Sequence, residues 1–283
     1  MAEITAAMVM KLRDETGLPM MDCKKALQET NGDFELAKQK ARESGKKIMS
    51  IRQDRTTEEG RIAAYSTLDP PVGAMIELQV ESAPVAKHED LVALSNDLAK
   101  QLAVGPGADK PEDLWKQPAP SRKGMTLEQW KDEIEGKMRE VLRLARIVRI
   151  DLPAGNYVHH DAKSGVLLVV EGGNDDLAKG VAMHVAAMKP KATNTAELEK
   201  SLVEKERAIL TEQARKEGKP ENIIEKMIEG RMRNFYAEHV LSEQPFVKDE
   251  KQTVGKVAAA GGMKLVKFIR WQLGESAGEK PAA

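Results

Sequence analysis

The same succession of patterns occurs twice in this 283-residue chain: two strand-like stretches joined by a tight turn, then an amphipathic helix. The strand-like stretches are 61–67 with 74–80 in the first copy and 156–160 with 166–170 in the second. The helices begin near His88 and Asn174, and both carry acidic residues in the first turn, where the helix dipole favours them. This repeat predicts an α+β fold whose core consists of two pseudo-symmetric hairpin-plus-helix subdomains.

The segment before this core, residues 1–45, reads as three short helices that share a small apolar core. Thr5 can cap the first helix, and Gly17 can end it in a left-handed turn. The apolar residues at helical spacing are Met8, Leu12, Met20, Cys23, Leu27, Phe34, Ala37 and Ala41. So small a bundle, near the lower limit of about 40 residues for independent stability, would resemble the three-helix ubiquitin-associated domains.

Between the bundle and the core, residues 46–58 are polar with little periodicity, which predicts a linker. Within the first half of the core, 105–120 is rich in proline and predicts a loop. Thr126 then opens a helix with Gln129 three residues on, the spacing of a capping box. A strand over 146–152 follows that helix.

After the second copy, two long amphipathic patterns over 195–217 and 221–240 are joined by only three residues, Gly218-Lys219-Pro220. So short a connection forces the two helices to run antiparallel, which predicts a protruding helical hairpin, a coiled coil. Its predicted contact residues are Leu198, Leu202 and Ile209 on one arm and Ile224, Met227, Ile228 and Phe235 on the other. A short helix over 253–259 and a strand over 264–273 come next, and disorder is predicted from Gly278.

These patterns divide the chain into six segments. They are a three-helix N-terminal module over 1–45, a linker over 46–58, core subdomains over 59–152 and 153–194, the helical hairpin inserted in the core over 195–240, and a C-terminal strand with a small module over 241–283.

Composition limits the possible functions. The chain has 44 basic and 45 acidic residues, so it lacks the cationic excess of a protein whose main task is to neutralise phosphates. A single cysteine, Cys23, rules out an internal disulfide and indicates a reducing compartment. No apolar run approaches the roughly 20 residues of a membrane-spanning helix, and the N-terminus shows no targeting pattern. We therefore expect a cytoplasmic protein that does not bind membranes.

The motifs of catalysis are also missing. The sequence has no phosphate-binding glycine loop, no dinucleotide fingerprint and no serine in a nucleophile elbow. Its five histidines show no metal-ligand spacing with Cys23 or with acidic clusters. We therefore predict a non-enzyme with no catalytic residue, no cofactor, no metal and no nucleotide pocket of its own, acting through several docking surfaces.

A run of motifs is similar to one known family. Leu12-Arg13, Thr16-Gly17, Met20-Met21-Asp22-Cys23-Lys24-Lys25-Ala26-Leu27 and Asn31-Gly32-Asp33 closely resemble the N-terminal signature of the elongation factor Ts family. The resemblance continues, in the family's order, at Val85-Ala86-Lys87, Tyr157-x-His159, Met183-His184, Glu229-Gly230-Arg231-Met232, Gln244-Pro245-Phe246-Val247, Thr253-Val254-Gly255 and Phe268-Ile269-Arg270. The matches span almost the whole chain.

The resemblance implies a cytoplasmic guanine-nucleotide exchange factor for the GTPase elongation factor Tu. Such a factor would bind elongation factor Tu with GDP, disturb its magnesium and phosphate site, and hold the nucleotide-free form until GTP binds. The N-terminal and C-terminal modules would dock on the GTPase domain, and the second half of the core would reach the partner's distal domain. No nucleic acid would be required.

The resemblance places partner contacts on the N-terminal module and on the second hairpin. Met20 and Met21 follow Leu18-Pro19, and because one helical face cannot bury both, we expect one in the core and the other on the partner. The expected partner-binding residues are Leu12, Thr16, Gly17, Met20, Met21 and His159. By contrast, His184 lies on an apolar helical face and is expected to be a hydrogen-bonded core residue. Gly230 is expected to allow close packing of the hairpin against the core.

The segment 81–87 corresponds to the part of the family that dislodges magnesium from the partner, and here the sequence departs from the family. The family usually has Thr-Asp-Phe where this chain has Ser82-Ala83-Pro84. Full burial of a phenylalanine contributes roughly 1.5–3 kcal/mol, so its loss could weaken coupling tenfold or more. We expect Ala83, Pro84, Val85 and Ala86 still to press on the partner, with Pro84 as a smaller, rigid wedge. The alternative is that this loop only turns the chain.

Two other functions are compatible with parts of the sequence. An RNA-binding or ribosome-associated scaffold is suggested by the basic linker and by Arg143, Arg146 and Arg149, which alternate with apolar residues on a strand. A ubiquitin-like-fold receptor is suggested by the first 45 residues alone, but it leaves the rest of the chain unexplained.

Overall fold

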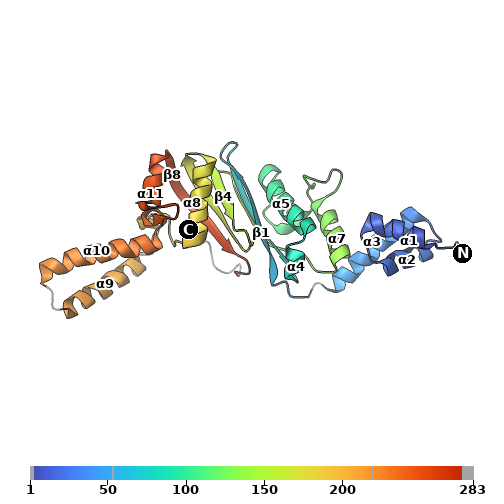
Figure 1. The fold of residues 1–283 in the computed structure, drawn as a ribbon, viewed down its shortest axis with the longest axis horizontal. Coiled ribbons are helices and arrows are strands. Elements are labelled where there is room, and N and C mark those ends of the chain that lie inside the picture. The colour runs from blue at the N-terminus through green and yellow to red at the C-terminus, as the bar shows by residue number, and fades with distance from the viewer. Residues whose placement is uncertain (1–2, 53, 218–219, 276–283) are drawn as a thin grey trace. The chain divides into compact units, whose positions relative to one another are not determined.

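The computed structural model describes residues 3–52, 54–217 and 220–275. The chain forms two compact units, each built from several stretches of sequence. The first unit consists of Met1–Tyr65, Ala74–Arg149 and Asp161–Lys163, and the second of Ser66–Gly73, Ile150–His160 and Ser164–Ala283. Figure 1 labels many of the elements along the chain. The boundaries drawn from the sequence between smaller domains stay predictions.

The first unit begins with the three predicted helices: α1 (Ala6–Thr16), α2 (Met20–Glu29) and α3 (Phe34–Ile51). The side chain of Thr5 caps α1, and Gly17 ends it with φ 69°, as the sequence predicted. The buried core consists of Val9, Leu12, Leu18, Cys23, Ala26, Leu27, Ala37 and Ala41. α3 runs on to Ile51, so the first part of the predicted linker 46–58 is helical. A single glycine such as Gly45 costs only about 1 kcal/mol in a helix and does not have to end it.

The same unit contains a three-stranded sheet in the order β1 (Glu59–Thr67), β2 (Val72–Val80), β3 (Arg143–Ile150). Its main helices are α5 (Glu89–Val104) and α7 (Leu127–Met138). Leu91, Leu94, Leu98 and Leu102 of α5 are completely buried, and Thr126 and Gln129 form the predicted capping box of α7. The predicted loop 105–120 contains a short helix, α6 (Pro111–Trp115), since proline favours the first turn of a helix.

Two of the arginines that suggested RNA binding make internal contacts in β3. Arg146 forms an ion pair with Glu77 at 2.6 Å, and the Glu77 side chain is 1% exposed. Arg149 donates through Nη1 to the carbonyl oxygens of Leu102 and Gly105, at 3.2 and 2.9 Å. These side chains therefore bind the protein itself, which weakens the RNA-binding alternative for two of the three arginines on this strand.

The second unit is built on an antiparallel sheet in the order β4 (Ala154–Val158), β5 (Ser164–Gly172), β8 (Met263–Gln272). In each sheet the first two strands form a hairpin, and the third strand lies beside the second strand of that hairpin. The two sheets therefore have the same strand arrangement, in keeping with the repeat in the sequence. α8 (Asp175–Met188), capped by Asn174, packs on β4 and β5. The C-terminal strand thus completes the second sheet of the core.

The predicted helical hairpin consists of α9 (Lys200–Lys216) and α10 (Glu221–His239), which lie side by side (Figure 1). A short helical turn, η1 (Thr195–Glu197), precedes it. Its core includes Leu198, Leu210, Ala214, Ile224, Ile228, Met232 and Phe235. Ile209, predicted to point inward, is 41% exposed, because Leu210 takes the inward position on α9. The predicted close packing of Gly230 is also wrong: a Cβ atom there would meet nothing within 4 Å.

Short elements complete the second unit: η2 (Leu241–Glu243), β6 (Pro245–Phe246), β7 (Asp249–Thr253) and α11 (Val254–Ala260). α11 begins at the Thr253 cap, near the predicted start. The hairpin connection at 218–219 and the predicted disorder from Gly278 lie outside the described residues. Among the helices that the structure describes, none has the length and apolar character required to cross a membrane.

Candidate partner-binding site

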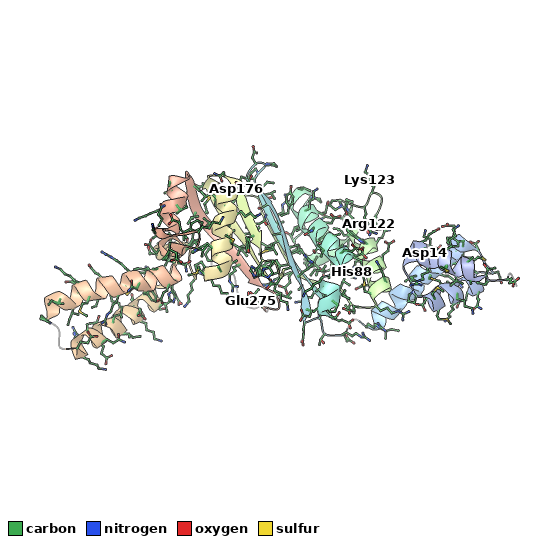
Figure 2. All side chains as sticks on the ribbon, in the orientation of Figure 1. Asp14, His88, Arg122, Lys123, Asp176 and Glu275 are labelled. Carbon is green, nitrogen blue, oxygen red and sulfur yellow. The ribbon has the colours of Figure 1, made fainter. Side chains whose placement is uncertain are left out.

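The segment that the sequence singled out as a wedge is a single helical turn, α4 (Ala83–Ala86), between β2 and α5. Pro84 is exposed at this turn, Ala83 and Val85 are half-buried, and Ala86 is 6% exposed. His88 follows at once and caps α5, accepting the N–H of Asp90 through Nδ1 at 3.2 Å (Figure 2). The turn therefore offers Pro84 to the outside while Ala86 holds its inner side.

Side chains from distant parts of the first unit bind both ends of this turn. Glu140 accepts two hydrogen bonds from Ser82, one from the backbone N–H at 3.0 Å and one from the hydroxyl at 2.6 Å. At the other end, Arg61 on β1 donates through Nη1 to the carbonyl oxygen of Ala86 at 3.2 Å. Burial lowers the pKa of Arg61, but an arginine side chain stays protonated in proteins. The turn is thus fixed by one anionic and one cationic side chain.

The residue before the turn, Glu81, is held in a similar way. Its Oε1 accepts the backbone N–H of Val141 at 2.9 Å, and its Oε2 accepts from Arg55 at 2.9 Å. Burial by itself would raise the pKa of Glu81, but the Val141 hydrogen bond and the charges of Arg55 and Arg52 bring that pKa below its ordinary value. Glu81 is therefore a stable carboxylate at neutral pH.

On the N-terminal module, the residues expected to contact a partner fall into two groups. Met20 and Met21 are 41% and 71% exposed, so the expectation that one of them lies in the core is wrong. Leu18, only 6% exposed, precedes α2 and takes the inward place instead. We call the exposed surface formed by Met20 and Met21 the α1–α2 surface. Leu12 is completely buried, so it can support this surface from beneath but cannot touch a partner.

Thr16 and Gly17 shape the edge of that surface. The Thr16 hydroxyl donates to the carbonyl oxygen of Leu12 at 2.6 Å and lies within 3.4 Å of the Leu18 backbone N–H. Gly17 has a positive φ of 69°, a conformation that other residues rarely adopt. Together they turn the chain from α1 to the exposed methionines of α2.

In the second unit, His159 follows β4 directly. Its Nδ1 lies 3.2 Å from the hydroxyl oxygen of Tyr157, and its ring centroid lies 4.1 Å from that of His160. The ring is half-buried and its backbone N–H donates to Ser164 across the hairpin at 2.9 Å. No group of three or more potential metal ligands occurs among the residues for which the structure gives positions.

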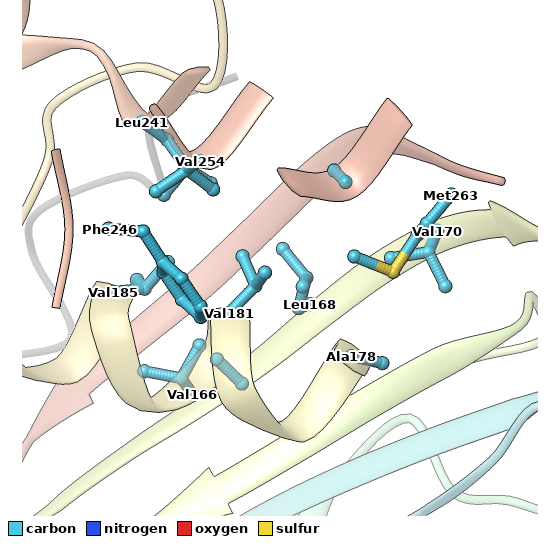
Figure 3. Packing of buried hydrophobic residues seen from close by; sticks show 12 residues of the cluster. Val166, Leu168, Val170, Ala178, Val181, Val185, Leu241, Phe246, Val254 and Met263 are labelled. Carbon is cyan, nitrogen blue, oxygen red and sulfur yellow. The ribbon is translucent and has the colours of Figure 1, made fainter. Parts of the chain in front are cut away.

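His184 confirms the prediction of a hydrogen-bonded core histidine. It is completely buried on α8; Nε2 lies 2.9 Å from Oε1 of Gln244, and Nδ1 accepts the backbone N–H of Val247 at 3.2 Å. Burial lowers the pKa of His184, although the Gln244 hydrogen bond partly opposes this. The ring lies beside that of Phe246, which Figure 3 shows next to Val181 and Val185 of α8.

The expected contact residues thus belong to separate structural settings. The α4 turn and the α1–α2 surface are parts of the first unit, and His159 is part of the second. Sequence reasoning missed Glu140, Arg61 and Arg55, which hold the α4 segment. A glutamate or arginine in a polar stretch carries no local signal of a partner that lies far away in the sequence.

Comparison of the sequence with known proteins finds relatives that all carry the same name. The family model described as elongation factor TS matches residues 81–275, a range that begins at the residue before Ser82. The elongation factor Ts of Alkalilimnicola ehrlichii is 41% identical over 280 residues, covering 98% of this chain and 94% of that protein. Those of Azoarcus sp. and Methylococcus capsulatus are 40% and 39% identical over 282 and 274 residues, covering 99% and 96% of this chain and 94% and 92% of those proteins.

Proposed function

The chain belongs to the elongation factor Ts family, the nucleotide exchange factors for elongation factor Tu in translation elongation, and we propose that its α4 turn is the part that disturbs the partner's magnesium and phosphate site. Members of the family are not enzymes, and elongation factor Tu is the partner. The factor must use its binding energy at a site where this lowers the affinity of the GTPase for GDP.

The proposed action depends on a difference between two affinities. The factor binds GDP-loaded elongation factor Tu, and it binds the nucleotide-free form more tightly. By thermodynamic reciprocity, the affinity of the GTPase for GDP then falls by the same factor. Magnesium keeps a near-ideal octahedral geometry and tolerates little displacement, so modest pressure on its site is enough to release the nucleotide. We place this exchange in the cytoplasm, with no nucleic acid required.

The observation that supports α4 in this role is its exposed tip on a fixed base. Pro84 is exposed, while the turn beneath it is held by Glu140 at one end and by Arg61 at the other. Proline fixes φ near −65°, so the tip is rigid although it is smaller than the family's phenylalanine. A rigid tip can transmit pressure to a partner that a mobile loop would lose.

The remaining contacts would hold the factor in place while α4 acts. Met20 and Met21 are the apolar residues of the α1–α2 surface, with Thr16 and Gly17 at its edge, and methionine adapts well to a partner's shape. His159 would contact the partner's distal domain from the second unit. Leu12 would contribute only by supporting α2 from below.

The test is the release of a fluorescent GDP analogue from elongation factor Tu. The wild-type chain is expected to accelerate release, and Pro84→Gly to slow the accelerated rate about threefold or more, because glycine removes both the apolar tip and the fixed backbone. Pro111→Gly is the control, since Pro111 also lies in the first turn of a short helix, α6. An unchanged rate in Pro84→Gly would overturn the role of α4, and no acceleration by the wild type would overturn the whole proposal.

A further inference from the structure

We propose that Glu140 is a positioning residue for exchange: its carboxylate fixes the α4 turn in the orientation that presents Pro84 to elongation factor Tu. The inference rests on the proposed function of α4 and extends it to a residue outside the turn. Glu140 is 58 residues from Ser82 in the sequence and precedes β3, the neighbour of β2 in the sheet.

The α4 turn cannot hold its shape unaided. It contains four residues, far below the roughly 12–15 that an isolated helix needs for even marginal stability. Ser82 occupies the N-cap position, but its side chain makes no capping hydrogen bond to the turn. The usual local means of fixing a helix start is therefore not used, and the turn depends on contacts from elsewhere.

Glu140 supplies that contact with both oxygens. Oε2 accepts the Ser82 backbone N–H at 3.0 Å, and Oε1 accepts the Ser82 hydroxyl at 2.6 Å. One hydrogen bond holds the backbone of Ser82 and the other holds its side chain, so a single carboxylate fixes both. Hydrogen bonds to an ionised group are about twice as strong as those between neutral groups. The Ser82 hydroxyl, which could have capped α4, instead binds the main body of the first unit.

A second carboxylate makes the matching connection in the opposite direction. Glu81, next to Ser82, accepts the backbone N–H of Val141, next to Glu140, at 2.9 Å. Each of the two neighbouring segments thus provides a glutamate to the backbone of the other. The reciprocal pair ties the exit of β2 to the entry of β3, and α4 begins directly at this junction.

The two glutamates differ in what they control. Glu81 binds Arg55 and the backbone N–H of Val141, and so joins the two segments. Glu140 binds Ser82, the residue directly before α4. Arg61 binds the carbonyl oxygen at the far end of the turn, at 3.2 Å. Removing the Glu140 carboxylate therefore frees the start of α4 while leaving the junction and the far end in place.

A fixed turn matters for exchange because ordering a loop during binding costs free energy that then cannot act on the partner. If Glu140 orders α4 beforehand, the loss of its carboxylate should lower the maximal rate of GDP release more than the affinity for elongation factor Tu. This split separates a positioning role from general weakening of the complex, because the docking surfaces elsewhere are unchanged.

The experiment measures GDP release from elongation factor Tu over a range of factor concentrations, giving a maximal rate and a half-saturating concentration. Glu140→Ala is expected to lower the maximal rate about tenfold, the scale of a hydrogen bond to a charged group. The half-saturating concentration should change less than about twofold, and Glu140→Gln, which keeps an oxygen acceptor, should recover part of the rate. Ser82→Ala combined with Glu140→Ala should be no slower than Glu140→Ala alone.

Glu133→Gln is the matched control. Glu133 is a half-buried glutamate of α7 that pairs with Arg122 at 3.2 Å, and its change should leave both parameters as they are. If Glu140→Ala fails to fold, Glu140→Gln decides the question alone. A normal maximal rate in the folded Glu140 variants, alongside a slow Pro84→Gly, would overturn the positioning role and leave the proposed function standing. Normal rates in both sets would instead remove α4 from the mechanism.

Discussion

His184 and Gln244 are both completely buried, and Nε2 of the histidine lies 2.9 Å from Oε1 of the glutamine. Because Nδ1 accepts the N–H of Val247, the ring proton sits on Nε2 and is donated to Gln244. A second proton would have to enter at Nδ1, directly opposite the Val247 N–H. The neutral ring therefore joins α8 to the segment around β6, and the structure has no place for the charged form.

This arrangement predicts a loss of stability in mild acid. Burial lowers the pKa of His184, so the unfolded chain takes up the proton at a higher pH than the folded protein does. The free energy of unfolding should be unaffected by this group above about pH 6.5 and should fall as the pH drops below it. Urea unfolding at pH 7.5 and 5.5 should show a smaller shift in His184→Gln than in wild type. His160→Gln, a change at an exposed histidine, should keep the wild-type shift; equal shifts in all three proteins would contradict the assignment.

Gly230 predicts a stabilising mutation. It lies inside α10, is exposed, and has nothing within 4 Å of the place a Cβ atom would occupy. Gly230→Ala should therefore raise the free energy of unfolding by up to about 1 kcal/mol, since glycine is the poorer helix former. Gly255→Ala in α11 is the matched control, because its Cβ would lie 2.9 Å from the carbonyl oxygen of Ser242 and should destabilise. Urea midpoints measure both, and destabilisation by Gly230→Ala would show that the site is more crowded than the structure indicates.

The buried ion pair between Glu77 and Arg146 predicts a large effect when one partner is removed. Arg146→Met would remove the positive charge that Arg146 places 2.6 Å from the Glu77 carboxylate, which is 1% exposed, at a cost of about 3–5 kcal/mol. Adding Glu77→Leu to that variant should recover much of the loss, because the uncompensated charge is then gone. Lys116→Met, which breaks the exposed pair with Asp113, should change stability by less than about 0.5 kcal/mol. Chemical unfolding of the four proteins distinguishes these outcomes.

Met21 is 71% exposed, and we expect its substitution to change only the affinity for elongation factor Tu. Burial of a methionine side chain contributes about 1.5–3 kcal/mol, so Met21→Ser should weaken binding to elongation factor Tu roughly tenfold or more and leave the maximal rate of GDP release unchanged. Met10→Ser changes another exposed methionine, 54% exposed on α1, and should bind normally. Titration of GDP release supplies both parameters. Equal weakening by the two changes would mean that Met21 is not a specific contact.

Much of the local structure could be predicted from the sequence because its signals lie within a few residues of one another. Thr126 and Gln129 cap α7 across three residues, and Thr5 and Gly17 mark the two ends of α1 in the same way. The repeated hairpin-plus-helix pattern likewise predicted the two-stranded part of each sheet. The pairing of the third strand of each sheet required the fold, since β3 returns to β2 across four helices and β8 joins β5 from about 90 residues further along the chain.

The direction in which single side chains point was less predictable. On α9 the inward residue is Leu210 and the exposed one is Ile209, although neighbouring residues on a helix differ by only about 100° and both are apolar. At the start of α2, Leu18 takes the place that Met20 would otherwise fill. In both cases the choice depends on which neighbouring helix is present to receive the side chain, and local sequence does not contain that information.

The sequence by itself determined the family, the order of the main helices and strands, and the position of the segment that contains α4, since each is written in residues that are close together in the chain. Only the tertiary structure decided what holds that turn, because Glu140 and Ser82 are 58 residues apart and are brought together where β2 ends and β3 begins, two strands that are neighbours in the sheet. Local hydrogen-bonding and packing preferences act over one or two helical turns, whereas a carboxylate finds distant donors through the arrangement of the whole unit.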